Sequence, residues 1–270
     1  MSSPKIGKVR PDNPAQLTDF KVLSFDVYST LVNEHNGMYN SLLPLLEQLP
    51  EPKTYIDDKE RTLREFHAVE WTLQHENPKL LYPEILAKGY VKFARDLGLD
   101  EPGEEEIAKF RTQIPSWPSF PDTIPALHTL HKYYKLILLS NIDNASISKT
   151  IANALGGIEF DGVYTAQEIG SYKPDNRNFE YLLKGAEDLL GELEGEGKKV
   201  LLHTGQGLES DMVPAKKMGM SSVWIDRDGQ EEKYQSLKDE VNFTWRFNTL
   251  GEMAEAVEKA FGEKEKKRAD

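Results

Sequence analysis

Asp26 directly follows an apolar run, residues 22–25, and has no second acid beside it. An aspartate carboxylate can attack carbon or phosphorus and form an ester or acyl phosphate, which water then hydrolyses. Lys173 can keep that carboxylate ionised and balance charge in the transition state. A second acid, Asp211 or Glu209, can activate the water. The sequence therefore predicts nucleophilic catalysis, with Asp26, Lys173 and Asp211 as the catalytic residues.

Polar side chains at the ends of other apolar runs complete this set. Ser140 and Asn141 end the run at residues 135–141, and Asp143 follows them. Ligands of open α/β sheets bind at the carboxyl ends of the strands, so we expect these residues to lie near Asp26. Ser140, Asn141 and Thr30 are predicted to position the substrate or the nucleophile by hydrogen bonds.

Short apolar runs define the elements that must position these residues. Near-continuous Val, Ile and Leu without alternation is typical of a sheet covered on both faces. Strands alternating with helices predict a parallel α/β sheet. The predicted strands are residues 20–27, 135–141, 160–166, 199–205 and 221–226. The predicted helices between the later strands are residues 122–134, with an Asp122 cap, 178–190, and 210–220, which ends near a C′ glycine at Gly219.

The interval from residue 32 to 119 interrupts this alternation. It contains helical patterns but no convincing strand, and its proline- and aromatic-rich end reads as a hinge. We predict a core of residues 1–31 and 120–262, a helical cap of residues 32–119, and a charged tail or frayed helix end at 263–270. A surface loop is expected at 191–199. The helices predicted in the cap are residues 38–48, 57–75, 82–97 and 104–113.

Composition limits the class of protein. The chain has 270 residues, 39% of them hydrophobic, a net charge of −12 and no cysteine. The negative charge disfavours nucleic acid as a partner, although the local field of a cleft can still accept a small anionic substrate. The lack of cysteine excludes disulfides and a thiol nucleophile. With no signal peptide and no membrane-length apolar run visible, we expect a cytoplasmic protein without a membrane partner.

The motifs taken together resemble the haloacid dehalogenase (HAD) superfamily. The matching stretches are FDVYSTL (25–31), LLSN (138–141), YKPD (172–175), TGQGLESD (204–211) and AKKMGMSSVWIDR (215–227). Each is weak alone, but their order is specific, and they cover most of residues 20–31 and 120–227. The resemblance implies an α/β fold with a Rossmann-like three-layer parallel sheet core. It also implies a helical cap inserted between the first two motifs.

Tyr28 decides which branch the sequence resembles. Most phosphatases of the superfamily carry a second aspartate there as general acid, and tyrosine, with a pKa near ~10, is a poor substitute. The 2-haloacid dehalogenase branch has a tyrosine at this place, since halide leaves without a proton. The resemblance thus implies hydrolysis of a small 2-halo carboxylic acid, and a homodimer. The implied substrate-binding residues are Tyr28, Thr30, Ser140, Asn141 and Arg64.

The fourth motif bears on cofactors. Phosphatases of the superfamily hold Mg²⁺ through the nucleophile and an acid after a glycine, where this chain has Gln206. Glutamine is a weaker ligand for a hard cation than carboxylate. We therefore expect no metal and no cofactor. If Mg²⁺ does bind, Asp26 and Asp211 would hold it, with Glu209 compensating for Gln206, and the protein would be a Mg²⁺-dependent phosphatase of a small phosphate ester.

Other positions depart from the dehalogenase pattern. Ser29 replaces the usual glycine, and Leu208 stands where the dehalogenases have asparagine. Arg64 is the nearest candidate for the cap arginine that clasps halide or carboxylate, although a gap-free alignment places Glu65 there. These departures keep open a third function, a catalytically weak binding or regulatory protein. His203, inside a predicted strand, is interpreted as a core histidine with hydrogen-bond partners.

Overall fold

A computed structural model describes residues 6–10, 14–191 and 197–269. Its described residues form a seven-stranded sheet in the order β1-β7-β6-β5-β2-β3-β4. All neighbouring strands pair in parallel except β1 and β7, which are antiparallel. The predicted parallel α/β sheet is therefore confirmed, with one antiparallel edge. The strands are β1 (Gly7–Lys8), β2 (Val22–Phe25), β3 (Lys135–Ser140), β4 (Gly162–Thr165), β5 (Leu201–Gly205), β6 (Ser221–Ile225) and β7 (Trp245–Phe247).

Each of the predicted strands contains a strand of the structure, from β2 to β6. The edge strands β1 and β7 were not predicted, because they are 2 and 3 residues long. Strands so short present too few residues for a hydrophobic pattern to be recognised. They extend the sheet beyond β6 and do not contribute the residues singled out for catalysis.

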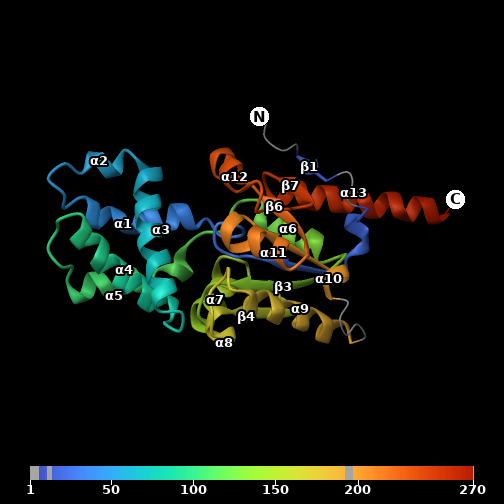
Figure 1. The fold of residues 1–270 in the computed structure, drawn as a ribbon, viewed down its shortest axis with the longest axis horizontal. Helices are drawn as coiled ribbons and strands as arrows, with labels where there is room; N and C mark the ends of the chain where they lie inside the picture. The colour runs from blue at the N-terminus through green and yellow to red at the C-terminus, as the bar shows by residue number, and fades with distance from the viewer. Residues whose placement is uncertain (1–5, 11–13, 192–196, 270) are drawn as a thin grey trace.

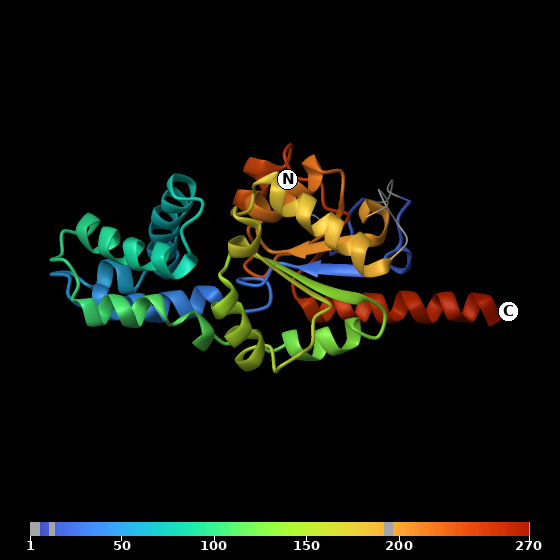
Figure 2. The same ribbon diagram turned by 90° about the horizontal axis from the view of Figure 1, so that it is seen from below.

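The sheet is the middle of three layers. Leu23 and Phe25 of β2 belong to the hydrophobic cluster that contains residues of α6 (Thr123–Leu130) and α13 (Leu250–Ala269). Val22 belongs to the other cluster, with residues of α9 (Asn176–Leu190) and α11 (Val213–Lys217). Successive side chains of a strand point to opposite faces, so a strand covered on both sides must be apolar throughout. α9 and α11 lie on one side of the sheet, and α6 and α13 lie on the other (Figure 2).

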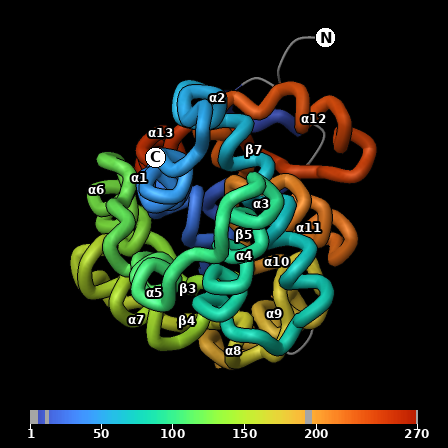
Figure 3. Tube along the Cα trace, turned by 90° about the vertical axis from the view of Figure 1, so that its left-hand side faces the viewer, coloured from blue at the N-terminus to red at the C-terminus, as the bar shows by residue number. Residues whose placement is uncertain are grey.

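The interval assigned to the cap forms a group of helices beside the sheet layers (Figure 1). An antiparallel bridge between Val32 and Ser119 joins the chain entering this group to the chain leaving it. Viewed from the cap end, α3, α4 and α5 lie in front of the strands of the core (Figure 3). The boundaries at residues 32 and 119 stay predictions. The helices are α1 (Glu34–Leu46), α2 (Lys53–Ile56), α3 (Lys59–Glu76), α4 (Tyr82–Asp96), α5 (Glu104–Arg111) and the 3₁₀ turn η2 (Ile114–Ser116).

The remaining elements connect the strands. The predicted loop at 191–199 lies partly outside the described residues, and α10 begins inside it at Gly197. Residues 263–269, predicted as a charged tail or frayed helix end, continue α13. Gly219 has φ +68°, as expected of the predicted C′ glycine. The elements not yet named are η1 (Leu17–Asp19), α7 (Asn144–Asn153), α8 (Ala166–Ile169), α10 (Gly197–Val200), the π-helical turn η3 (Leu208–Met212) and α12 (Glu231–Leu237).

The predicted capping role of Asp122 is wrong. Asp122 stands at the N-cap position of α6, but its side chain makes no capping hydrogen bond. Its carboxylate instead accepts hydrogen bonds from Arg227 Nη1 at 2.9 Å and from the backbone N–H of Gly251 at 3.1 Å. A buried guanidinium needs a carboxylate partner, and this ion pair ties α6 to the segment after β6.

Within the described ranges, no helix combines the length and the apolar character needed to cross a lipid bilayer.

Candidate active site

Asp26, Lys173 and Asp211 meet at the carboxyl edge of the sheet. Lys173 Nζ donates to Asp26 Oδ1 at 2.8 Å and to Asp211 Oδ1 at 2.6 Å. It also donates to the carbonyl oxygen of Leu139 at 3.1 Å. The Lys173 side chain is only 1% exposed, and that of Asp26 is 13% exposed. The structure thus joins residues 147 positions apart in the chain and leaves the Asp26 carboxylate partly open to a substrate.

The position of Asp26 is fixed by the turn that follows β2. The backbone N–H of Asp26 donates to the carbonyl of Thr204 in β5 at 2.9 Å. Thr30 Oγ1 donates to Asp26 Oδ2 at 2.6 Å, and accepts a hydrogen bond from the backbone N–H of Gln206 at 2.9 Å. Thr30 therefore holds the Asp26 carboxylate in one orientation, in agreement with its predicted positioning role.

The electrostatics of this cluster favour the ionised forms of Lys173 and Asp211 and work against the ionised form of Asp26. Burial raises the pKa of Asp26 above its ordinary value, Lys173 opposes this effect, and Asp211 adds to it. Burial acts to lower the pKa of Lys173, but the carboxylates of Asp211 and Asp26 outweigh burial and raise it. For Asp211, burial is outweighed by Lys173 and His203, so its pKa is well below the ordinary value. The ammonium is the charge that stabilises both carboxylates.

Asp211 is held by further partners on its own side. Ser210 Oγ donates to Asp211 Oδ2 at 2.6 Å, and His203 Nε2 lies 3.0 Å from Asp211 Oδ1. His203 Nδ1 lies 2.8 Å from Ser24 Oγ in the neighbouring strand β2. His203 is fully buried, and both its ring nitrogens have hydrogen-bond partners. Its interpretation as a core histidine with hydrogen-bond partners is therefore confirmed. It also fixes the orientation of Asp211, a role that the sequence did not indicate.

Asn141 and Ser140 occupy different roles in this geometry. The Asn141 side chain makes two hydrogen bonds with the backbone of Lys173. Its Nδ2 donates to the carbonyl oxygen at 3.0 Å, and its Oδ1 accepts from the backbone N–H at 2.6 Å. Asn141 therefore positions Lys173. Ser140 Oγ is buried and has no hydrogen-bond partner among the described residues, so it can still bind a ligand.

Tyr28 follows Asp26 by two residues and packs between Thr150 and Trp117. It is half-buried, and its hydroxyl lies 3.0 Å from Thr150 Oγ1 of α7. Its ring makes an edge-to-face contact with Trp117, with centroids 5.7 Å apart. Burial raises the pKa of Tyr28 further above its ordinary value. A phenol in this environment is a still weaker acid than the free side chain, so it does not replace the aspartate of the phosphatases.

Ser29 occupies a backbone conformation that favours glycine. Its φ is +66°, in the left-handed region, where a residue with a side chain costs about 1–2 kcal/mol. Ser29 Oγ donates to Glu34 Oε2 at 2.9 Å, a contact that glycine cannot make. The departure from the glycine of the family pattern thus links the nucleophile turn to the first turn of α1.

The structure places Arg64 away from this cluster. Arg64 is exposed on α3, whereas the buried face of that helix carries Phe66, Val69 and Glu70. Its assignment to substrate binding stays a prediction that its position does not favour. Glu65 accepts hydrogen bonds from Arg61 and from Tyr55 within the cap. Glu65, the position given by the gap-free alignment, thus supplies no positive charge and is engaged by partners inside the cap.

The cap instead presents a hydrogen-bonded group that the sequence analysis missed. His67 Nδ1 lies 2.7 Å from Glu70 Oε2, and Tyr82 OH donates to Glu70 Oε1 at 2.7 Å. Burial acts to lower the pKa of His67, but Glu70 and then Glu34 outweigh burial and raise it. His67 and Glu70 are three positions apart in a predicted helix, a spacing that places two side chains on the same face. This spacing was the signal that could have predicted their contact.

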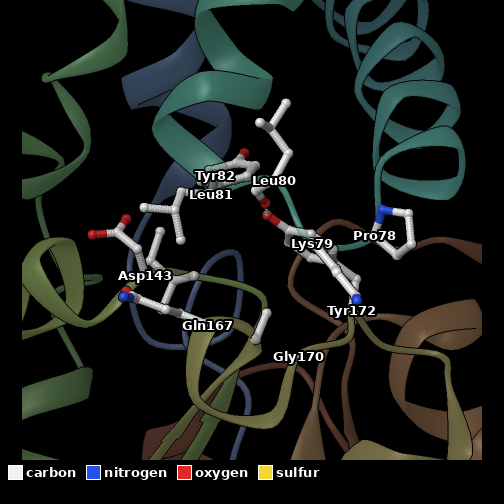
Figure 4. Close-up of a pocket in the computed structure, with 11 residues that line it drawn as sticks. Pro78, Lys79, Leu80, Leu81, Tyr82, Asp143, Gln167, Gly170 and Tyr172 are labelled. Carbon is white, nitrogen blue, oxygen red and sulfur yellow. Dashed lines mark hydrogen bonds between the residues drawn. The ribbon is translucent and has the colours of Figure 1, made fainter.

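A cavity of about 240 Å³ lies between cap and core (Figure 4). Its cap side includes Lys79, Leu80 and Tyr82, and its core side includes Asp143 and Tyr172. Tyr172 precedes Lys173 in the chain, and its hydroxyl donates to the carbonyl of Leu80 at 2.6 Å. Lys79, exposed and extending beside Tyr172 in Figure 4, brings a positive charge to this cavity.

The side chains that could hold Mg²⁺ all have protein partners in the structure. The side-chain amide of Gln206 lies 3.4 Å from Asp228 Oδ2, and Glu209 pairs with Lys233 at 2.8 Å. The carboxylates of Asp26 and Asp211 are engaged by Lys173, Thr30, Ser210 and His203. In the part of the chain that the structure describes, no group of three or more His, Asp or Glu could hold a metal ion. That this site works without Mg²⁺ stays a prediction.

Comparison with known proteins places this geometry in context. The family model of haloacid dehalogenase-like hydrolases matches residues 20–219. No curated protein matches this chain. The fold is similar to L-2-haloacid dehalogenase from Xanthobacter autotrophicus, with TM-score 0.69 and 19% identity over 88% of this chain and 98% of that one. The form of that enzyme with covalently bound chloropropionic acid gives TM-score 0.68, at 18% identity and the same coverage.

A putative HAD-hydrolase from Bacillus subtilis bound to magnesium is also similar. Its TM-score is 0.66, with 17% identity over 88% of this chain and 98% of that one. Identities this low show a shared fold, and the solved relatives include both a dehalogenase and a magnesium-bound protein.

Proposed function

This chain belongs to the haloacid dehalogenase-like hydrolase family, and we propose that it hydrolyses a small 2-halo carboxylic acid through an ester on Asp26. The observation that carries the proposal is the position of Lys173 Nζ, 2.8 Å from Asp26 Oδ1 and 2.6 Å from Asp211 Oδ1. Such a shared ammonium keeps a nucleophilic carboxylate ionised in a buried site. The phenol of Tyr28 in place of a second aspartate favours a leaving group that needs no proton.

The proposed reaction has two steps. A carboxylate oxygen of Asp26 attacks the carbon that bears the halogen, the new C–O bond forms, and halide leaves with the electron pair of the C–X bond. Water then attacks the carbonyl carbon of the ester and gives a proton to Asp211. The bond between that carbon and the ester oxygen of the substrate breaks, this oxygen takes the proton from Asp211 to become the hydroxyl of the 2-hydroxy acid, and the Asp26 carboxyl loses its remaining proton to solvent. Lys173 balances the negative charge on Asp26 before and after the ester exists.

Lys79 is proposed to bind the substrate carboxylate that Arg64 was expected to bind. Lys79→Ala is expected to raise KM for 2-chloropropionate roughly fivefold with little change in kcat, since an exposed ammonium contributes about 1 kcal/mol. Arg64→Ala is the matched control and should stay within about twofold of wild type. The measurement is the initial rate of halide release over a range of substrate concentrations. A larger effect in Arg64→Ala than in Lys79→Ala would restore the role predicted for Arg64.

Halide release is expected to be independent of Mg²⁺. Because the carboxylates of Asp26 and Asp211 are engaged by Lys173, turnover in EDTA should stay within about twofold of turnover in millimolar Mg²⁺. A paired assay measures halide release and phosphate release from sugar and nucleotide phosphates, each with and without Mg²⁺. Phosphate release that requires Mg²⁺ and disappears in Asp211→Ala would show instead the magnesium-dependent phosphatase considered from the sequence.

A further inference from the structure

A row of polar side chains crosses the face of the sheet that α9 covers. Ser24 of β2 pairs with His203 of β5, and His203 pairs with Ser222 of β6. Paired residues of parallel strands point to the same face, and this face otherwise carries the apolar cluster that contains Val22 and Phe179. All three polar residues are fully buried. Buried polar groups are unfavourable unless they are hydrogen-bonded, so this row needs an explanation.

His203 connects the row to Asp211. Its ring packs edge-to-face against Phe179, with centroids 5.4 Å apart. Its Nε2 lies 3.0 Å from Asp211 Oδ1, and its Nδ1 lies 2.8 Å from Ser24 Oγ. Ser24, His203 and Asp211 thus form a continuous hydrogen-bond chain from β2 through β5 to η3. Ser222 Oγ, on the strand at the other side of β5, has no hydrogen-bond partner within the described residues.

The other partners of Asp211 determine which nitrogen of His203 carries a proton. Asp211 Oδ1 accepts from Lys173 Nζ at 2.6 Å, and Asp211 Oδ2 accepts from Ser210 Oγ at 2.6 Å. A carboxyl beside an ammonium, with both oxygens accepting, is ionised and has no proton to donate. His203 Nε2 must therefore be the donor. In a neutral ring Nδ1 is then the acceptor, and the hydroxyl of Ser24 donates to it.

The two steps of the proposed reaction depend unequally on this hydrogen-bond chain. Attack of Asp26 on the carbon that bears the halogen needs no base. Water, in contrast, must give a proton to Asp211 when it attacks the ester. A general base works only within hydrogen-bond reach of the proton it takes, so the orientation of the Asp211 carboxylate decides the rate of this step. His203 is one of the groups that fix that orientation.

We infer that Ser24 and His203 are positioning residues for hydrolysis of the ester on Asp26. Ser24 holds the ring of His203 with its proton on Nε2, and His203 holds Asp211 in the orientation that accepts a proton from water. This assignment rests on the proposed function and confines both residues to its second step. It also gives a reason for a serine and a histidine on a sheet face whose other residues pack in an apolar cluster.

Halide release in the first turnover and in the steady state tests the assignment, because it separates the two steps. His203→Phe keeps an aromatic ring but removes the donor to Asp211. Rapid-quench assays with 2-chloropropionate should give the first equivalent of halide within about threefold of the wild-type rate, and steady-state release roughly a hundredfold slower. The ester should therefore accumulate on the quenched variant. His203→Gln can donate from its own amide and should recover roughly tenfold of that loss.

Ser24→Ala and Ser222→Ala form a matched pair. Each removes one fully buried serine hydroxyl from a residue paired with His203, but only the hydroxyl of Ser24 is bonded to the ring. Ser24→Ala should slow steady-state release roughly tenfold with accumulation of the ester, whereas Ser222→Ala should stay within about twofold of wild type. Equal effects in the pair would overturn the inference. A loss in Ser24→Ala that slows the first equivalent of halide as much as the later ones would also overturn it.

NMR of the histidine rings separates this inference from the proposed function, because it needs no substrate. ¹⁵N-edited spectra should show His203, identified by the signal that His203→Gln lacks, with its proton on Nε2 and none on Nδ1. A proton on Nδ1 in wild type would refute the inference whether or not halide is released. The Nε2 tautomer in a protein that releases no halide from 2-chloropropionate would refute the dehalogenase and uphold the hydrogen-bond chain.

Discussion

Replacing Asp26 by asparagine is expected to lower halide release by roughly 10⁴-fold or more, because an amide oxygen is a far weaker nucleophile than a carboxylate. The substitution keeps the size of the side chain and its acceptor for the hydroxyl of Thr30. Initial rates of halide release from 2-chloropropionate measure the loss. The proposed intermediate can be detected separately, because an ester on Asp26 changes the mass of the protein.

Mass spectrometry of protein quenched during turnover supplies the second measurement. Wild type should carry an added mass equal to that of the substrate acid minus hydrogen halide, located on the peptide that contains Asp26, and Asp26→Asn should not. Asp188→Asn, an exposed acid paired with Lys184, is the control and should behave as wild type. Undiminished turnover by Asp26→Asn would rule out the covalent mechanism, as would an ester found on another residue.

Lys173→Met is expected to abolish activity and to destabilise the fold by about 3–5 kcal/mol near neutral pH. Methionine fills much of the lysine volume but leaves the carboxylates of Asp26 and Asp211 without their shared cation. Burial already raises the pKa of Asp26, and removal of the ammonium should raise it further, so less of the nucleophile is ionised. Urea denaturation measures the stability, and halide release the activity.

The pH dependence of that destabilisation follows from the sign of each pKa shift. In wild type the pKa of Asp211 is lowered, so its contribution to stability is present above the unfolded value near ~3.9 and is lost as pH falls. The pKa of Lys173 is raised, so its contribution is present below the unfolded value near ~10.4 and is lost as pH rises through the folded value. The contribution of Asp211 and Lys173 to wild-type stability should therefore be nearly constant between about pH 5 and pH 10. The raised pKa of Asp26 has the opposite sign, so its contribution falls as pH rises from the unfolded value toward the folded value.

In Lys173→Met the buried carboxyls of Asp26 and Asp211 destabilise the fold least when they are protonated. The deficit relative to wild type should be larger at pH 8 than at pH 5, since ionisation of two buried carboxyls without a cation is unfavourable. Lys184→Met is the control. It removes the ion pair between Lys184 and Asp188, whose side chains are 75% and 67% exposed, and should change the free energy of unfolding by under about 0.5 kcal/mol at either pH. A deficit in Lys173→Met that is equal at both pH values would show that packing, and not charge, explains the effect.

The sequence by itself determined the fold class and the order of the site along the chain. Buried parallel strands must be apolar on both faces, so β2 to β6 were visible as apolar runs. The carboxyl ends of parallel strands share one edge, so polar residues just after those runs had to lie close together. Asp26 and Asp211 follow such runs, whereas Lys173 is predicted only from the order of the motifs, and the structure joins all three through the ammonium.

Only the tertiary structure decided what faces Asp26 from the cap. Residues of a helix share a face every three to four positions, so the phase of α3 sets Phe66 and Glu70 inward and Arg64 outward. That phase depends on how α3 packs on its neighbours, which a charged, weakly patterned sequence does not reveal. The contacts of Glu34 with Ser29 and of His67 with Glu70, and the approach of Lys79 to Tyr172, likewise arise only when cap and core are packed together.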